Sequence, residues 1–238
     1  MIRQAYLNES AVGRAIVKSS VPREEIFLTT KIWISNAGYE KAKLSIEESL
    51  SNLQTDYIDL VLVHRALNDY YGTYQAMVEY YHKGKIRALG VSNFYGDRLV
   101  DLAEFSTVVP MVNQIELHPF YQQEALRKTM REYNTIPEAW SPLAEGKNNL
   151  FTHELLSSIG QKYQKTAAQV TLRYLIQLGI VVIPKTVRRE RMVENFSIFD
   201  FELTKEEMDK IAQLDNNISL FMDHHNPEVI KELAKLGK

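Results

Sequence analysis

The sequence contains no cysteine, and this absence removes several kinds of chemistry. Disulfide bonds, thiolate catalysis and cysteine-ligated zinc sites all require that residue. A chain of 238 residues without a cysteine fits a protein of the cytoplasm, where disulfides are rare. We therefore expect a cytoplasmic protein.

Long hydrophobic runs and a strong excess of one charge are also missing. One of the longest apolar runs, Gly179–Ile183, is far too short to span a bilayer, and the polar N-terminus lacks the apolar stretch of a signal peptide. The formal net charge is only −2, so no broad basic surface is implied. We expect neither a membrane nor a nucleic acid as a partner.

No linker or low-complexity tract divides the chain, and we expect one domain over residues 1–238. Apolar, β-branched runs alternate with stretches of helical period, a pattern typical of parallel strands joined by crossover helices. The expected strands are 26–31, 57–64, 86–93, 109–116, 135–140 and 179–185. The expected helices are 8–18, 38–53, 70–83, 95–104, 122–133, 165–177, 188–195 and 204–214.

Two α/β architectures fit this alternation, the doubly wound sheet and the (β/α)8 TIM barrel. No G-x-G-x-x-G follows any expected strand, and GVSNF at 90–94 is not one, so a dinucleotide-binding doubly wound sheet loses its usual phosphate loop. Polar or aromatic residues end the expected strands, and in a barrel such ends share the face that carries the active site. These residues are Lys31, His64, Ser92, Asn93, Gln114, Trp140 and Lys185.

Each of these residues also has a purely structural interpretation. Lys31 suits a solvated strand end, a lone histidine such as His64 is more often a satisfied core residue, and Trp140 suits core packing. Gln114 and Asn93 suit turn caps. Their recurrence at successive strand ends favours a polar pocket instead.

Several segments, in this order, resemble the signatures of the aldo-keto reductase family. They are AYLNESAVGRAI, TTKIW, LQTDYIDLVLVH, GKIRALGVSNF, VNQIELHPF and IPKTVRRERMVEN. The segment AEGKNNLF at 144–151 is similar to the bacterial group that reduces diketogluconate or methylglyoxal. The resemblance covers nearly the whole chain and implies a TIM barrel that transfers hydride from NADPH (NADP+ when oxidised) to an aldehyde or ketone.

The resemblance also implies catalytic roles. Tyr6 would be the general acid that protonates the developing alkoxide, and because a phenol has a reference pKa of about 10, it needs a nearby cation. Lys31 would supply that charge, and His64 would orient or polarise the carbonyl oxygen. Trp33 is expected to form a wall of the substrate pocket. The structural alternative for Tyr6 is an aromatic residue packed on the rim of the barrel.

Cofactor-binding residues carry over in the same way. Ser92, Asn93 and Gln114 resemble the ligands of the nicotinamide carboxamide, and Trp140 the residue that stacks on the nicotinamide. Ser141 and Leu143 resemble residues along the pyrophosphate. The resemblance assigns the adenosine 2′-phosphate to Lys185, Thr186 and Arg191, which favours NADPH over NADH, and adenine to Glu194 and Asn195. The structural alternative for this basic segment is a solvated helix start.

The chain departs from the family pattern near its start. About two strands and one helix of the family precede the position of Tyr6, and the family's catalytic aspartate aligns with Met1–Arg3, so we expect about six parallel strands. A later departure puts Ala66 where the family often has proline, which changes a substrate loop. Six strands cannot close an eight-stranded barrel, and the exposed strand edges would favour self-association.

Three functions follow from these expectations. The first is an NADPH-dependent oxidoreductase that reduces small-molecule carbonyl compounds. The second is a catalytically impaired relative that binds NADPH without turnover. The third is a structural protein that forms homo-oligomers through its strand edges.

Overall fold

The computed structural model describes residues 8–237, which divide into two compact units. The first unit comprises the chain up to Asn113, the short segment Glu132–Thr135 and the chain from His224 onward. The second comprises Gln114–Arg131 and Ile136–Asp223. The expectation of one domain over 1–238 stays a prediction. No helix within 8–237 combines the length and apolarity needed to cross a membrane.

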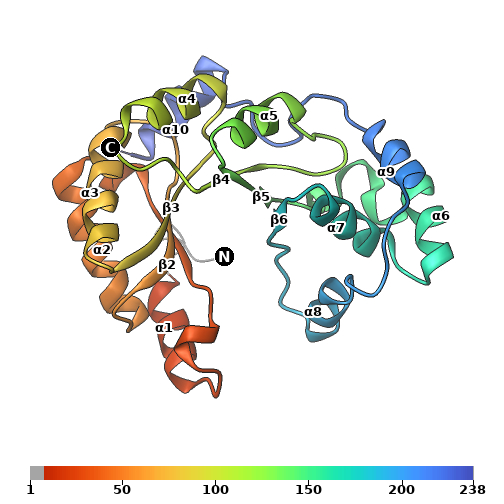
Figure 1. Ribbon diagram of the computed structural model, residues 1–238, viewed down its shortest axis with the longest axis horizontal. Helices are drawn as coiled ribbons and strands as arrows, with labels where there is room; N and C mark the ends of the chain where they lie inside the picture. The colour runs from red at the N-terminus through yellow and green to blue at the C-terminus, as the bar shows by residue number, and fades with distance from the viewer. Residues whose placement is uncertain (1–7, 238) are drawn as a thin grey trace. The chain divides into compact units, whose positions relative to one another are not determined.

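Strands and helices alternate along the chain as predicted (Figure 1). The strands occur in chain order and are β1 (Thr29–Ile32), β2 (Ile58–Val63), β3 (Ile86–Ser92), β4 (Val112–Glu116), β5 (Ile136–Trp140) and β6 (Val181–Val182). The predicted helices are α1 (Glu9–Lys18), α2 (Tyr39–Leu53), α3 (Tyr70–His82), α4 (Gly96–Phe105), α5 (Glu124–Glu132), α7 (Ala167–Gln177), α8 (Arg189–Phe196) and α9 (Lys205–Ala212). The α/β class with parallel strands is thereby confirmed.

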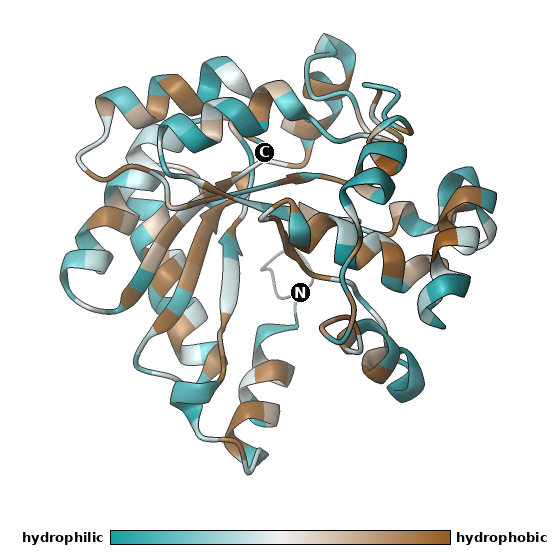
Figure 2. Ribbon diagram, turned by 45° about the vertical axis from the view of Figure 1, so that its right-hand side comes forward, coloured by the Kyte–Doolittle hydropathy of each residue, from teal (hydrophilic) through white to brown (hydrophobic). Residues whose placement is uncertain are grey.

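The first unit is built on three parallel strands, with β1 paired to β2 and β2 to β3. All six residues of β2 are buried, and helices α2 and α3 pack against this part of the sheet. Figure 1 shows α2 and α3 side by side against these strands, and Figure 2 shows the strands as largely hydrophobic. This arrangement explains why the strand pattern is nearly continuous in β-branched and aliphatic residues.

The second unit pairs β5 with β6 in parallel. Helix α7 packs beside β6 and carries eight buried residues, among them Leu172 and Leu175. Its start is fixed by a capping box in which the side chains of Thr166 and Gln169 each bond the other's backbone N–H. This cap explains why the helix begins where it does.

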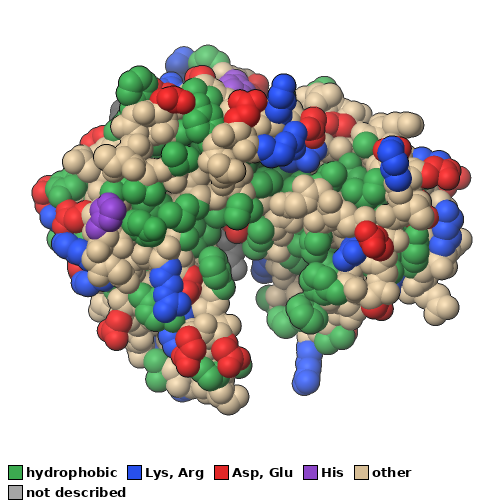
Figure 3. Space-filling model, viewed as in Figure 1, with side chains coloured by type: hydrophobic (Ala, Val, Ile, Leu, Met, Phe, Trp, Pro, Cys, Tyr) green, Lys and Arg blue, Asp and Glu red, His purple; other side chains and the backbone are tan. Residues whose placement is uncertain are grey.

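Three further elements lie outside the predicted alternation. They are the interrupted 3₁₀ segment η4 (Ala144–Thr152) and the helices α6 (Glu154–Tyr163) and α10 (Pro227–Lys235), beside two short turns, η2 (Arg23–Glu25) and η3 (Ile34–Asn36). η4 and α6 lie between β5 and α7, and α10 follows α9, so the predicted alternation was complete without these three elements. On the face shown in Figure 3, acidic and basic side chains are interspersed without a broad region of one sign.

Candidate active site

Helix α1 is anchored next to the strand that carries Lys31. The buried Glu9, 4% exposed, accepts hydrogen bonds from Thr30 Oγ1 at 2.7 Å and from Ser49 Oγ at 2.9 Å. Thr30 is the neighbour of Lys31 on β1, so Glu9 fixes the start of α1 against this strand. Tyr6, the predicted general acid, lies outside the described residues 8–237.

Three predicted residues occupy neighbouring positions: Lys31 lies on β1, His64 follows β2 directly, and Ser92 ends β3. Lys31 pairs with Leu62, and Leu62 pairs with Gly90. Because side chains alternate along a strand, His64 and Ser92, each two residues further along, face the same side of the sheet as Lys31. The exposed fractions of Lys31, His64 and Ser92 are 3%, 2% and 0%, so all three are buried. The register therefore brings together the predicted amine, imidazole and hydroxyl.

His64 is flanked by two further predicted residues. The Trp33 ring lies edge-on to the imidazole, with centroids 4.7 Å apart, and its Nε1 donates to the carbonyl oxygen of Leu236 at 3.4 Å. Asn93 adopts a left-handed backbone with φ 59° and donates from Nδ2 to Ser92 Oγ at 3.0 Å and to the His64 carbonyl at 3.5 Å. The first unit thus assembles the predicted substrate wall and two predicted carboxamide ligands around one imidazole.

In the second unit, Gln114 on β4 is buried at 1% exposure and donates from Nε2 to the carboxyl group of Glu138 on β5. Glu138 is itself only 6% exposed. Because the buried carboxyl group accepts from the amide nitrogen, it fixes the positions of Nε2 and Oε1 in the Gln114 side chain. Gln114 therefore presents a defined amide orientation, as a carboxamide ligand would require.

Trp140 ends β5 and packs against a segment from much later in the chain. The rings of Trp140 and Phe221 meet edge to face, with centroids 5.4 Å apart. The Nζ atom of Lys147 lies over the Phe221 ring, 4.0 Å from its centroid. It also donates a hydrogen bond to the carbonyl oxygen of Leu220 at 2.5 Å. The predicted nicotinamide-stacking indole thus packs against Phe221, and Lys147 from the loop after β5 holds residues 220–221 in turn.

The loop that carries Ser141 and Leu143 has an unusual backbone. Positive φ angles occur at Ser141, Ala144, Glu145, Gly146, Asn148 and Asn149. Left-handed backbone at residues other than glycine costs free energy and is concentrated at ligand-binding sites. Ser141 Oγ donates to Glu145 Oε1 at 3.4 Å, which ties the turn to itself. The geometry fits a loop shaped around a ligand.

The predicted phosphate site surrounds the start of α8. Thr186 Oγ1 accepts from the backbone nitrogen of Arg188 at 3.1 Å, and no side chain caps the helix itself. Lys185 and Arg191 are both exposed at this end. Exposed N–H groups and two cations at one helix start suit a phosphate dianion. The residues present therefore fit the 2′-phosphate of NADPH.

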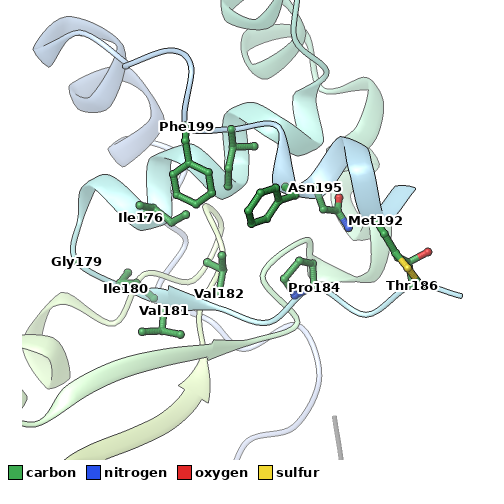
Figure 4. Close-up of a pocket in the computed structure, with 12 residues that line it drawn as sticks. Ile176, Gly179, Ile180, Val181, Val182, Pro184, Thr186, Met192, Asn195 and Phe199 are labelled. Carbon is green, nitrogen blue, oxygen red and sulfur yellow. The ribbon is translucent and has the colours of Figure 1, made fainter. Parts of the chain in front are cut away.

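A cavity of about 750 Å³ adjoins this helix (Figure 4). Thr186, Met192 and Asn195 line it beside apolar residues such as Pro184 and Phe199, a mixture that suits a flat heteroaromatic ring. Asn195 thus lies where an adenine contact would be expected.

Glu194 points elsewhere: its Oε1 accepts from Thr166 Oγ1 at 2.7 Å, so this side chain braces α8 against the start of α7. Among residues 8–237, no three His, Asp or Glu side chains are grouped as metal ligands would be.

Four residues of these sites escaped sequence analysis. Glu9, Glu116, Glu138 and Phe221 each hold a predicted residue or its segment in position. A carboxylate within an apolar strand pattern was the available signal for Glu116 and Glu138, since such a residue must find buried donors. No local pattern marks Phe221.

Comparison with known proteins agrees with this fold. Residues 4–216 match the aldo/keto reductase family. Glyoxal reductase of Bacillus subtilis is 45% identical over 213 residues, which cover 89% of this chain and 76% of that protein.

Two solved structures extend the comparison. An aldo-keto reductase from a deep-sea metagenome library superposes with a TM-score of 0.92 at 41% identity, covering 94% of this chain and 84% of that one. The Bombyx mori aldo-keto reductase in complex with NADP superposes with a TM-score of 0.86 at 33% identity, covering 93% and 79%. The family expected from the sequence signatures is confirmed, and so is the expected relation to its barrel: the chain belongs to the aldo/keto reductase family.

Proposed function

We propose that this protein is an NADPH-dependent reductase that converts aldehydes and ketones to alcohols, with Tyr6 as the general acid. The observation that carries the proposal is the adjoining, buried arrangement of Lys31, His64 and Ser92 at three successive strands. Family membership and the NADP complex of the Bombyx mori relative support the reaction class and the cofactor. The similarity to glyoxal reductase makes small dicarbonyl compounds the first substrates to test.

The proposed mechanism assigns one task to each side chain. Tyr6 donates its phenolic proton to the carbonyl oxygen as negative charge develops there. The ammonium group of Lys31 stabilises the resulting phenolate, because an adjacent cation favours the charged form of a phenol. His64 donates a hydrogen bond to the same oxygen and orients it. Bound NADPH supplies the hydride.

Each unit, taken by itself, carries residues with a proposed role in cofactor binding. Ser92, Asn93 and Gln114 bind the carboxamide, Trp140 stacks on the nicotinamide ring, and the loop with Ser141 and Leu143 follows the pyrophosphate. Lys185, Thr186 and Arg191 bind the 2′-phosphate. Asn195 faces adenine, and Glu194 supports it by fixing α8 to α7. A cytoplasmic location and self-association through strand edges stay predictions.

The decisive experiment follows protein fluorescence during an NADPH titration and then nicotinamide absorbance after addition of methylglyoxal. We expect quenching followed by oxidation of NADPH. Tyr6→Phe and Lys31→Met should each lower kcat by roughly 100-fold or more while the Kd of NADPH changes less than threefold. The exposed Lys205→Gln serves as the control.

The alternative function, cofactor binding without turnover, is not favoured by the comparisons, and the same titration decides it. Quenching with no loss of absorbance for any simple aldehyde would support that alternative. A chain that shows neither response would overturn both the reductase and the cofactor-binding functions.

A further inference from the structure

Glu138 on β5 is a buried carboxyl group to which the family signatures assign no role. Only 6% of this residue is exposed, and its Oε1 accepts a hydrogen bond from Nε2 of Gln114 on β4. The two strands are neighbours in the sheet, and both residues belong to the second unit. A carboxyl group costs more free energy to bury than an amide of the same size. Packing alone would therefore favour glutamine at position 138, and the carboxyl group calls for another explanation.

Glu138 adjoins two residues that have proposed roles at the nicotinamide end of the cofactor. One is Gln114, its hydrogen-bond partner, which is proposed to bind the carboxamide. The other is Trp140, which is proposed to stack on the nicotinamide ring. Trp140 lies two residues after Glu138 on β5, so the alternation of side chains puts both on the same face of this strand. An effect of Glu138 on Gln114 is therefore an effect on the predicted carboxamide site.

The two ends of the Gln114 amide differ in what they bind. Nε2 only donates and Oε1 only accepts, whereas an ionised carboxyl group only accepts. Glu138 therefore holds Nε2, and a turned amide would bring two acceptor oxygens together. In a planar amide the oxygen lies on the other side of the carbonyl carbon from the nitrogen. On the side away from Glu138, Gln114 thus offers an acceptor to a ligand.

We propose that Glu138 makes the cofactor site select the carboxamide form of the dinucleotide over the deamidated form, in which a carboxylate replaces the carboxamide. The inference rests on the proposed function, in which Gln114 binds the cofactor. The NH2 group of a carboxamide donates to Oε1 of Gln114. A carboxylate has no such donor and would set one acceptor oxygen against another. Glu138 is a positioning residue, because it acts through Gln114.

Three ligands measure this selection without turnover. They are NADP+, nicotinic acid adenine dinucleotide phosphate, which carries the carboxylate, and 3-acetylpyridine adenine dinucleotide phosphate, in which a methyl group replaces the NH2. In calorimetric titrations of the purified chain, the Kd of NADP+ should be roughly tenfold or more below that of the acid and roughly threefold or more below that of the acetyl analogue. Equal Kd values for the three ligands would overturn the proposal.

The variant Glu138→Gln separates positioning from charge. The new amide donates as well as accepts, so Gln114 is free to turn and to present Nε2 to the ligand. Both Kd ratios, acid to NADP+ and acetyl analogue to NADP+, should then fall to about twofold or less. The acetyl analogue carries no carboxylate, so a change in its ratio cannot come from the removal of charge repulsion. If only the ratio for the acid changes, Glu138 acts on the ligand through its charge and the proposal is wrong.

A double-mutant cycle tests whether Glu138 acts through Gln114. Gln114→Ala should itself lower both ratios, and the addition of Glu138→Gln should change them by less than about twofold. Losses that add in the double variant would contradict the assignment. Near-ultraviolet circular dichroism checks that each variant is folded. If Glu138→Gln does not fold, Glu138→Met is the second variant, and it should also lower both ratios because this hold on Nε2 is gone.

Two further carboxyl groups provide matched controls. Glu116 is also buried in the second unit, but it accepts from the Ser219 hydroxyl and the Leu220 backbone rather than from the Gln114 side chain. Glu202 is exposed. Glu116→Gln and Glu202→Gln should both keep the parent's two ratios. A ratio that falls in Glu116→Gln as far as in Glu138→Gln would show that any buried carboxyl group has this effect, and would overturn the proposal.

A fourth ligand, 2′-phosphoadenosine diphosphate ribose, lacks the pyridine ring and reports a purely structural role. Its Kd should agree within about twofold between the parent and Glu138→Gln. A rise in parallel with the Kd of NADP+ would mean that Glu138 only stabilises the fold, which overturns the proposal. A parent that binds none of the four ligands refutes both the proposed function and this inference. Selective binding of NADP+ without oxidation of NADPH supports the selection and counts only against the reductase function.

Discussion

Glu116 and Ser219 are 103 residues apart in the chain, yet the serine hydroxyl donates to Glu116 Oε2 at 2.6 Å. The other carboxyl oxygen of Glu116 accepts from the backbone nitrogen of Leu220 at 2.8 Å and from His118 Nε2 at 3.0 Å. Glu116 is fully buried. One carboxyl group at the end of β4 therefore anchors the segment whose next residue, Phe221, packs on Trp140.

Replacement of Glu116 by Gln should release this segment. The glutamine amide has one acceptor oxygen, whereas the carboxylate has two. Its NH2 group would therefore face either the Ser219 hydroxyl or the Leu220 backbone N–H, and that donor would lose its acceptor. We expect a loss of about 2–4 kcal/mol in the free energy of unfolding, against about 1 kcal/mol for Ser219→Ala. Urea unfolding followed by fluorescence in a Trp33→Phe background, which leaves Trp140 as the only tryptophan, measures both. Equal free energies of unfolding for the parent and E116Q would show that these contacts of Glu116 do not stabilise the fold.

Gly90 on β3 gives a second prediction. It is closely packed between the side chain of Leu62 on β2 and the backbone of Val112 on β4. A Cβ at this position would meet Leu62 Cδ2 and the Val112 carbonyl oxygen at 2.6 Å each. Gly90→Ala should therefore cost about 1–3 kcal/mol through overpacking. Gly96→Ala at the start of α4 is the control, since nothing lies within 4 Å of its added Cβ, and it should be neutral or slightly stabilising. Thermal unfolding distinguishes the two.

The fold was largely predictable, and so were the parts of the site that lie on strands. Lys31, His64 and Ser92 were recognisable as polar residues in or just after buried strands, and parallel register then requires them to adjoin. Periodicity depends only on neighbours in the chain, which is why it finds such elements.

Contacts between distant segments were not predictable for the same reason. Nothing near Glu116 points to Ser219, and nothing near Trp33 points to Leu236 at the far end of the chain. Helix α10 lies after the last predicted element. The partner of a buried polar group is chosen by tertiary packing, so the sequence indicates only that a partner must exist.

A comparison of NADPH binding with NADH binding tests whether the start of α8 binds the 2′-phosphate. Lys185→Gln and Arg191→Gln each remove an exposed cation beside an uncapped helix start. Each should raise the Kd of NADPH roughly fivefold to tenfold and leave NADH within twofold, because only NADPH carries the 2′-phosphate. Added salt should weaken the binding of NADPH more than the binding of NADH. Lys205→Gln, whose side chain is 87% exposed, is the control. Parallel losses for both nucleotides would show that these cations act on something other than the 2′-phosphate.

Glu207 on α9 gives the protein a defined response to acid. Burial of this carboxyl group would raise its pKa, but hydrogen bonds from Tyr163 and Lys162 and from the Thr204 backbone outweigh burial and lower the pKa from 4.5 to about 2. Its side chain is 3% exposed, so solvent screens these contacts little. The pKa is lower in the folded than in the unfolded chain, so the contribution to stability is complete above pH 4.5 and is lost as the pH falls toward 2.

The expected size of this contribution is about 3 kcal/mol, from a shift of roughly two units or more. Glu207→Gln should therefore be clearly less stable than the parent at pH 7, and the gap should narrow between pH 5 and pH 3 as the parent loses its advantage. Tyr163→Phe removes one donor and should show a smaller gap with the same pH dependence. Glu202→Gln, an exposed carboxylate without these contacts, should keep the parent's profile. Urea midpoints by circular dichroism at each pH decide the matter: a gap that stays constant from pH 7 to pH 3 means that Glu207 stabilises α9 by packing and not through its charge.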